Sequence, residues 1–142
     1  MFLGEFEHLI DDKGRLTLPA KFRAELADGF VITKGIDRCL FVYTLDEWQP
    51  LAEKISRLPV TKREARALAR LVFAGASDCS LDKQGRILIP SYLRQYANLN
   101  SEVVIVGLDT HLEIWDLESW QKVSQKIEEE AESIAEQLSG LI

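Results

Sequence analysis

Two short segments carry the residues best suited to chemistry, and both have the pattern Asp-x-x-x-Arg with a glycine just before the arginine. In such a turn the carboxylate caps backbone N–H groups, and the glycine adopts a positive φ. The arginine has a planar fork of donors that suits phosphate oxygens and the O6 and N7 atoms of guanine. We predict that the arginines bind DNA and that the other motif residues shape the turns. The motif residues are Asp11, Gly14 and Arg15 in the first copy, and Asp82, Gly85 and Arg86 in the second.

Each turn also carries a lysine near its tip, Lys13 in the first copy and Lys83 in the second. Together with the two arginines, these lysines predict a pair of exposed basic loops that rest on DNA phosphates and reach into a groove. The copies differ, because Gln84 stands at the position of Lys13 and Lys83 stands at the position of Asp12. We therefore expect the two copies to contact DNA differently.

Cysteine and histidine residues offer a second kind of chemistry. When the two copies are aligned, His8 falls opposite Cys79 and Cys39 falls opposite His111, so a Cys₂His₂ zinc site is arithmetically possible. Zinc sites normally have paired ligands two to four residues apart, and these residues are not so spaced. We predict packing roles for all four, no metal and no cofactor. Without a GxSxG, an HExxH or a Gly-rich phosphate loop, we also expect no enzymatic activity.

Composition and charge fit a cytoplasmic globular protein that binds no membrane. The chain has 142 residues, of which 46% are hydrophobic, and no apolar run reaches the roughly 18 residues that a membrane span needs. The net charge of −6 argues against a nucleic-acid partner, but seven acidic residues and two lysines from Asp116 onward contribute −5 of it. The remaining residues are close to neutral, so a local basic face is compatible with the sequence.

The two motifs belong to a longer internal repeat. Residues 2–23 align without a gap on residues 73–94, and the similarity resumes, after one residue of slippage, between 40–49 and 112–121. A chain with this repeat divides into two similar units, a connector and a tail. The predicted parts are a first unit at 1–49, a helical connector at 50–72, a second unit at 73–121 and a C-terminal amphipathic acidic helix at 122–142.

The sequences of the two units predict the same order of secondary-structure elements. Strands flank each Asp-x-x-x-Arg turn, and Pro19 and Pro90 then open short helices. A longer helix begins after Thr44 in the first unit and after Asp116 in the second, because both residues are good N-caps. Between the short and the long helices lie two apolar strands per unit, near 30–33 and 40–43 in the first and near 103–106 and 112–115 in the second.

The sequence patterns of the connector and the tail predict further helices. Pro59 ends one connector helix, and a capping box from Thr61 to Glu64 predicts that a second helix follows. A basic face on that second helix could pair with the acidic tail of a neighbouring subunit. The tail has an apolar stripe at spacings of three and four residues, which predicts one amphipathic helix. The stripe consists of Val123, Ile127, Ala131, Ile134 and Leu138.

Each unit has an Asp-x-x-Gly-Arg motif followed by an apolar strand and a proline, then a Gly-(Ile/Leu)-Asp segment, and finally a Trp-Gln ending. In these three features the sequence resembles the MraZ family. The halves of that family are similar to the SpoVT-AbrB swapped-hairpin DNA-binding domain. The resemblance covers residues 1–121. It implies a bacterial, nucleoid-associated transcriptional regulator that binds promoter DNA ahead of the division and cell wall gene cluster. It also implies a homo-oligomeric ring on direct repeats of double-stranded DNA, with the motif residues above as the DNA-binding loops.

The expected fold is α+β, with two pseudo-symmetric swapped-hairpin (SpoVT-AbrB-like) units forming a barrel flanked by helices. One such unit cannot close a barrel alone, whereas two copies in one chain can pair internally. An alternative function is an antitoxin-like or other protein-interaction module built on the same barrel. That alternative would need a disordered tail, whereas this tail has the pattern of a helix.

Overall fold

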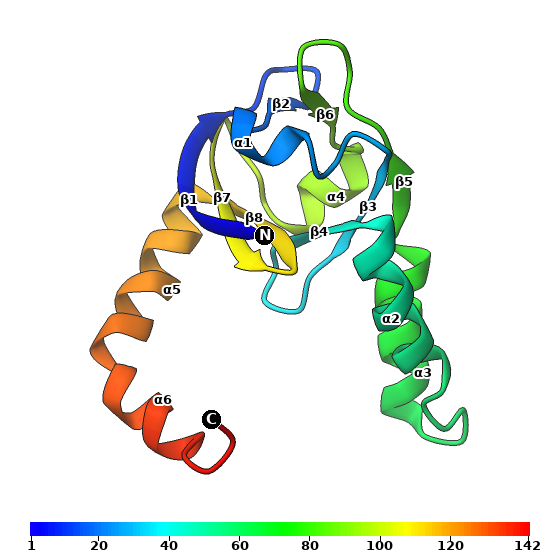
Figure 1. Ribbon diagram of the computed structural model, residues 1–142, viewed down its shortest axis with the longest axis vertical. Helices are drawn as coiled ribbons and strands as arrows, with labels where there is room; N and C mark the ends of the chain where they lie inside the picture. Colours follow the sequence, from blue (N-terminus) through cyan, green and yellow to red (C-terminus); the bar gives the residue numbers. More distant parts are fainter.

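The structure is a computed structural model that describes residues 1–142. Six strands form one antiparallel sheet in the order β1-β7-β8-β4-β3-β5, and β2 and β6 form a separate two-stranded ribbon (Figure 1). The strands are β1 (Phe2–Leu9), β2 (Arg15–Thr17), β3 (Phe30–Lys34), β4 (Leu40–Thr44), β5 (Ser77–Cys79), β6 (Arg86–Leu88), β7 (Glu102–Asp109) and β8 (His111–Asp116). The helices are α1 (Ala20–Arg23), α2 (Leu45–Ser56), α3 (Arg63–Ala69) with a π-helical continuation (Arg70–Ala74), α4 (Ser91–Tyr96), α5 (Leu117–Glu129) and α6 (Ala131–Gln137).

Strand pairing is exchanged between the two units. Strand β1 pairs with β7, β2 with β6, β3 with β5 and β4 with β8, and each of these pairs joins one unit to the other. Swapping the units leaves the strand order of the large sheet unchanged. Within the first unit, β1 and β2 meet only through a bridge between Ile10 and Leu16. The predicted α+β class and the two pseudo-symmetric, swapped units are therefore confirmed.

The predicted barrel is not confirmed, because the large sheet does not close. Strands β1 and β5 are its two edges, and neither pairs with the other. The ribbon does not complete the sheet, since apart from the Ile10–Leu16 bridge its backbone groups bond across the ribbon or within the two turns. Beyond the three paired residues of each strand, Leu18 N–H donates to Gly85 O and Ile89 N–H donates to Gly14 O.

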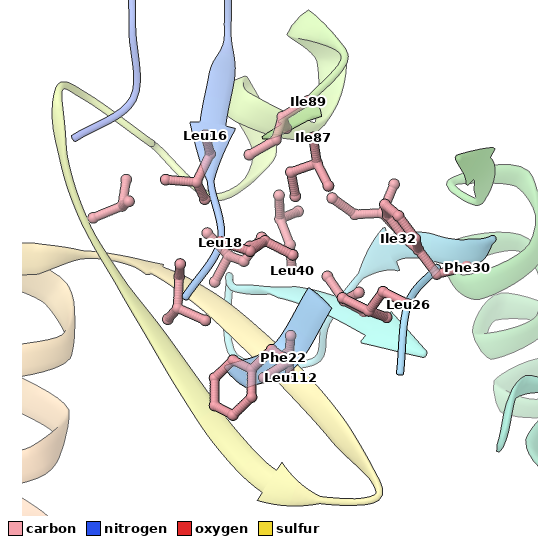
Figure 2. Close-up of a cluster of buried hydrophobic side chains, with 14 of the residues drawn as sticks. Leu16, Leu18, Phe22, Leu26, Phe30, Ile32, Leu40, Ile87, Ile89 and Leu112 are labelled. Atoms are coloured by element: carbon pink, nitrogen blue, oxygen red, sulfur yellow. The ribbon is translucent and has the colours of Figure 1, made fainter. Parts of the chain in front are cut away.

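The main core lies between the ribbon and the large sheet (Figure 2). On the ribbon, Leu16 and Ile87 face each other and are 0% and 1% exposed. Phe22 from α1 and Leu93 from α4 close the core on the helical side. Burying a side chain of this size contributes roughly 1.5–3 kcal/mol. Because side chains alternate along a strand, the inward position of Leu16 and Ile87 turns their neighbours outward.

Two of the three predicted helix caps are present. Thr44 Oγ1 accepts a hydrogen bond of 3.2 Å from the backbone N–H three residues on, and Asp116 Oδ2 accepts one of 3.1 Å in the same way. The capping box at Thr61 is wrong, because α3 follows Lys62, which makes no side-chain cap. There the chain forms a turn in which Lys62 N–H donates to Pro59 O at 3.0 Å, so Thr61 lies inside the turn.

Two helical arms project from the sheet on the side away from the ribbon (Figure 1). The basic arm comprises α2 and α3, and the acidic arm comprises α5 and α6. The predicted single tail helix is interrupted at Glu130, between α5 and α6. Its apolar stripe has little cover within the chain, since Ile127, Ile134 and Leu138 are 48%, 38% and 45% exposed. None of the helices combines the length and apolar character that crossing a membrane requires.

Candidate nucleic-acid interface

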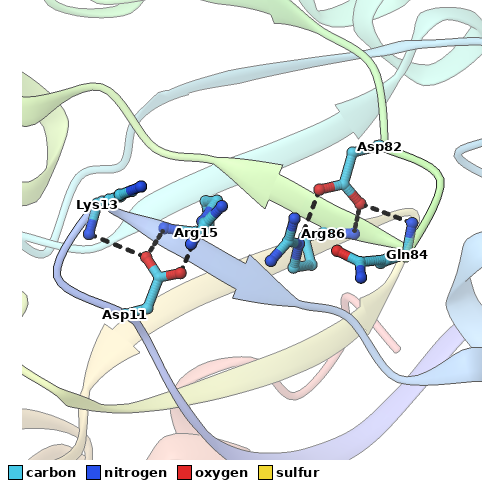
Figure 3. A network of polar contacts seen from close by, with 6 residues as sticks. All are labelled: Asp11, Lys13, Arg15, Asp82, Gln84 and Arg86. Carbon is cyan, nitrogen blue, oxygen red and sulfur yellow. Dashed lines mark hydrogen bonds and ion pairs between the residues drawn. The ribbon is translucent and has the colours of Figure 1, made fainter.

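The first Asp-x-x-Gly-Arg turn joins β1 to β2 and is organised by the carboxylate of Asp11 (Figure 3). Asp11 Oδ1 accepts hydrogen bonds from the N–H groups of Lys13 at 3.0 Å and Arg15 at 2.9 Å. Asp11 Oδ2 accepts from Arg15 Nε at 2.6 Å. These bonds, above all that from the Arg15 N–H, lower the pKa of Asp11. The carboxylate is therefore ionised at neutral pH and holds the arginine.

The second turn repeats this geometry between β5 and β6. Asp82 Oδ1 accepts from the N–H groups of Gln84 and Arg86, both at 2.9 Å, and Asp82 Oδ2 accepts from Arg86 Nε at 2.7 Å. The pKa of Asp82 is lowered for the same reason, with the Arg86 N–H as the main cause. The arginines are partly buried, with side chains 34% exposed for Arg15 and 26% for Arg86, so they are less open than the sequence suggested.

Both motif glycines need the conformation that glycine tolerates best. Gly14 has a φ of +84° and Gly85 a φ of +73°. A Cβ on Gly14 would lie 2.8 Å from Arg94 Nε, and a Cβ on Gly85 would lie 2.6 Å from Arg23 Cδ. Each turn therefore packs against an arginine from the other unit, which leaves no room for a side chain.

Arg23 and Arg94 are two candidate site residues that the sequence reasoning did not propose. Arg23 Nε donates to Leu18 O at 2.9 Å, and Arg94 Nε donates to Ile89 O at 3.0 Å, so each guanidinium is fixed at one end of the ribbon. The signal was present in the repeat, because the two arginines occupy matching positions in residues 2–23 and 73–94. Their proximity to the opposite turn depends on the exchange of strands between the units.

The ribbon presents four side chains outward and places one turn at each end. In its register, Arg15 lies opposite Leu88 and Thr17 lies opposite Arg86, with the buried Leu16–Ile87 pair between them. We call these four outward residues the outer ribbon face. Figure 3 shows the two arginines between the two turns.

This end of the molecule has an excess of positive charge. The two ion pairs neutralise Arg15 and Arg86 in part, but four further cations have no carboxylate within 4 Å. Two of them, Lys13 and Lys83, are exposed at the turns, as the sequence predicted. The four cations are Lys13, Lys83, Arg23 and Arg94.

The four zinc-ligand candidates do not come together. His8 is on β1 and Cys79 is on β5, which are opposite edges of the large sheet. The imidazole of His111 stacks on the ring of Tyr43 with 4.6 Å between ring centroids. Cys39 is buried, and burial raises the pKa of its thiol to about 12, so it is protonated at neutral pH. No group of three or more His, Cys, Asp or Glu residues could hold a metal ion.

The fold and this surface define a class of protein. It is an intramolecular pseudo-dimer, in which two copies of a swapped-hairpin unit share one sheet and bring two matched Asp–Arg turns to one ribbon.

Comparison with known proteins identifies the family of the chain. Residues 1–71 and 72–140 each match the family model described as "MraZ protein, putative antitoxin-like". The chain is 52% identical over 140 residues to the transcriptional regulator MraZ of Caldanaerobacter subterraneus subsp. tengcongensis, which covers 99% of this chain and 98% of that protein. It is 53% identical over 138 residues to the protein of the same name from Natranaerobius thermophilus, covering 97% and 96%. The chain belongs to the MraZ family.

Proposed function

We propose that the protein is a sequence-specific DNA-binding transcriptional regulator and that the outer ribbon face with its two turns is the DNA-binding surface. The observation that carries this proposal is the duplication of one arginine-holding turn at both ends of a single ribbon whose outer side chains are partly exposed. The names of the similar proteins support it, since those proteins are called transcriptional regulators. The protein would then work on the nucleoid in the cytoplasm.

The dimensions of the ribbon fit the major groove. Four residue steps separate Gly14 from Leu18, which is about 13 Å at roughly 3.3 Å per residue. The turns lie at these two ends, because Gly14 bonds to Ile89 and Leu18 bonds to Gly85. The major groove of B-DNA is about 12 Å wide and admits a two-stranded ribbon. A ribbon in the groove would bring the two turns close to the phosphates on either side.

Each motif residue has a separate task in this arrangement. Asp11 and Asp82 bind the Nε atoms of Arg15 and Arg86 and leave their Nη atoms without a partner in the chain. A guanidinium fixed in this way loses less conformational freedom when it binds guanine O6 and N7. The unpaired cations at the turns, such as Lys13 and Lys83, would contact phosphates and set the position of the ribbon.

The two arms support assembly into a homo-oligomer. Residues 57–70 of the basic arm and its connection contain five basic residues and one acidic residue, whereas the chain from Asp116 onward carries −5. The basic arm has a groove of about 260 Å³ between Leu58 and Arg66, and the acidic arm has exposed apolar residues such as Ile134 and Leu138. A contact between the acidic arm of one subunit and the basic arm of the next is a head-to-tail contact. Such contacts close into a ring when the rotation between neighbouring subunits allows it.

Assembly would compensate for a modest affinity of each subunit. Two small basic turns neutralise few phosphates, so useful affinity needs several subunits on adjacent sites. Rotation-related subunits meet the duplex in one direction, which favours direct repeats. The family resemblance suggests the promoter of the division and cell wall gene cluster as the place where such repeats occur.

A binding experiment tests the DNA-binding function. The full-length protein is titrated against the duplex upstream of its own gene and against a shuffled duplex of equal length, at one salt concentration. We expect a clear preference for the first duplex. The Arg15→Ala/Arg86→Ala variant should lose at least about 30-fold in affinity, from about 1 kcal/mol or more per arginine. The Lys34→Ala/Arg38→Ala variant removes the same charge from the β3–β4 hairpin, outside the ribbon and both arms, and should change the affinity little. Equal binding to both duplexes would contradict the proposal and favour an antitoxin-like or other protein-interaction module.

Removal of α6 tests the assembly. A chain that ends at Glu130 keeps the sheet, the ribbon and both turns but loses most of the exposed apolar residues of the acidic arm. Light scattering should give a mass well above a dimer for the full chain and a lower mass for the truncated one. An unchanged mass after truncation would contradict the arm-to-arm contact.

A further inference from the structure

The outer ribbon face is nearly, but not fully, two-fold symmetric. The pseudo-two-fold axis passes between Leu16 and Ile87, which pair with each other and match in the repeat. It exchanges Arg15 with Arg86, so these arginines alone would read DNA equally in either direction along the groove. The same axis exchanges Thr17 with Leu88, and here the symmetry is broken.

Leu88 and Thr17 have different recognition chemistry. Leu88 is 60% exposed on a strand whose neighbouring residue is fully in the core, and it can offer only apolar contact. Thr17 is partly buried and carries a hydroxyl that donates and accepts hydrogen bonds. In the major groove, thymine is the base that presents a methyl group, so an apolar side chain distinguishes it from the other bases.

The register decides which base pair each residue would meet. Leu88 lies directly across the ribbon from Arg15, and Thr17 lies across from Arg86. Side chains opposite each other on antiparallel strands have Cβ atoms about 4.5–5.5 Å apart, and successive base pairs are about 3.4 Å apart. A guanine bound by Arg15 would therefore have a neighbouring base pair within reach of Leu88.

We propose that Leu88 is a specificity-determining residue that contacts the methyl group of a thymine beside the guanine bound by Arg15, and that the Leu88/Thr17 difference gives the ribbon a direction on DNA. This inference rests on the proposed DNA-binding function. It explains how a pseudo-symmetric ribbon suits direct repeats, because subunits of a head-to-tail assembly must all meet the duplex in the same orientation.

The test uses deoxyuracil, which lacks the thymine methyl group. A binding site is first selected from random duplexes with the wild-type protein, and each thymine in it is then replaced singly by deoxyuracil. At one thymine next to a guanine we expect about a 3- to 5-fold loss of affinity, as loss of one buried methyl group predicts. The Leu88→Ser variant should bind both duplexes equally. Leu3→Ser, which changes a leucine that is 50% exposed on β1, is the matched control and should keep the wild-type difference.

The exchange Thr17→Leu/Leu88→Thr tests direction. Because the arginines fit the groove in either direction, this variant should bind the selected site turned end to end, so a DNA-cleaving probe attached at Gln84 should cut at the opposite end of the site. The inference would be overturned if removal of the methyl group changed the affinity at no thymine, or if it changed the affinity of the wild type and of Leu88→Ser equally. Either result counts even when the wild type binds DNA specifically. A changed oligomer mass in Leu88→Ser, with methyl sensitivity retained, would also overturn it and place Leu88 in a contact between subunits. If the wild type selects no site, the proposed function itself fails.

Discussion

At the residue scale, the central device is one carboxylate per turn that accepts two backbone hydrogen bonds and one from the arginine. The arrangement fixes the start of each ribbon strand and the direction of the guanidinium together. The partly exposed ion pairs add little stability, since such pairs are worth about 0–1 kcal/mol. Their main effect is to hold the arginines in one orientation.

Replacement of Gly14 by alanine should destabilise the protein by more than positive φ alone explains. A non-glycine residue at such a φ costs about 1–2 kcal/mol, and here the new Cβ would also meet Arg94 and the Ile89 carbonyl. Gly29→Ala is the matched control, because Gly29 has a φ of +104° but its nearest neighbour would be 3.5 Å away. Urea unfolding should show the larger loss for Gly14→Ala. Equal losses would mean that the contact with Arg94 does not matter.

We expect His111 to lower the free energy of unfolding in mildly acidic solution. Burial lowers its pKa below the ordinary histidine value of 6.5, so below pH 6.5 the unfolded chain binds a proton that the folded chain resists. Stability therefore decreases as the pH falls from 6.5 through the folded pKa. The raised pKa of Glu113 changes stability with pH in the opposite direction. Because Glu113 is present in both proteins, a comparison of wild type and His111→Asn cancels its contribution. Unfolding at pH 7 and pH 5 should show a smaller pH effect in the variant, and an equal effect would be inconsistent with a neutral, half-buried imidazole.

At this scale the sequence indicated the turns well but not all of their neighbours. The Asp-x-x-Gly-Arg spacing contains its own hydrogen-bond partners, so it could be interpreted locally. Arg23 and Arg94 could not be assigned in that way, because each lies beside a turn about sixty and about eighty residues away in the chain, respectively.

At the element scale, the exchange of strands makes the two units one folding unit. Every ribbon and sheet pair except β3–β4 and β7–β8 joins residues of different units. Local patterns predicted the strands and two helix caps, since these depend on neighbouring residues. The open sheet and the break at Glu130 depend on long-range pairing, which local patterns do not specify.

A fragment of residues 1–71 should therefore not fold as a monomer. It keeps the β3–β4 pair but loses the partners of β1 and β2, and a single hairpin is marginal in water. Circular dichroism and light scattering should find either an unfolded chain or a homodimer in which a second copy supplies the missing strands. A folded monomer would contradict the shared core.

At the scale of the whole molecule, the ribbon and the arms point in opposite directions (Figure 1), so the proposed DNA-binding surface and the proposed assembly contacts do not overlap. Subunits that share one direction should bind repeats spaced by about one helical turn, roughly 10 base pairs. Inserting about 5 base pairs between two repeats should weaken binding sharply, and inserting about 10 should weaken it less. Affinities at one salt concentration test this, and equal affinity for all spacings, or preference for an inverted repeat, would argue for a two-fold dimer.

The most direct test of the DNA-binding surface is hydrogen–deuterium exchange of the full-length protein with and without its preferred duplex. Peptides that cover 11–18 and 82–89 should exchange more slowly in the complex, because both turns and the ribbon between them would contact the groove. The Arg15→Ala/Arg86→Ala variant, at the same DNA concentration, should show little of this protection. Protection confined to the arms or to the edges of the large sheet, with both turns unchanged, would contradict the account.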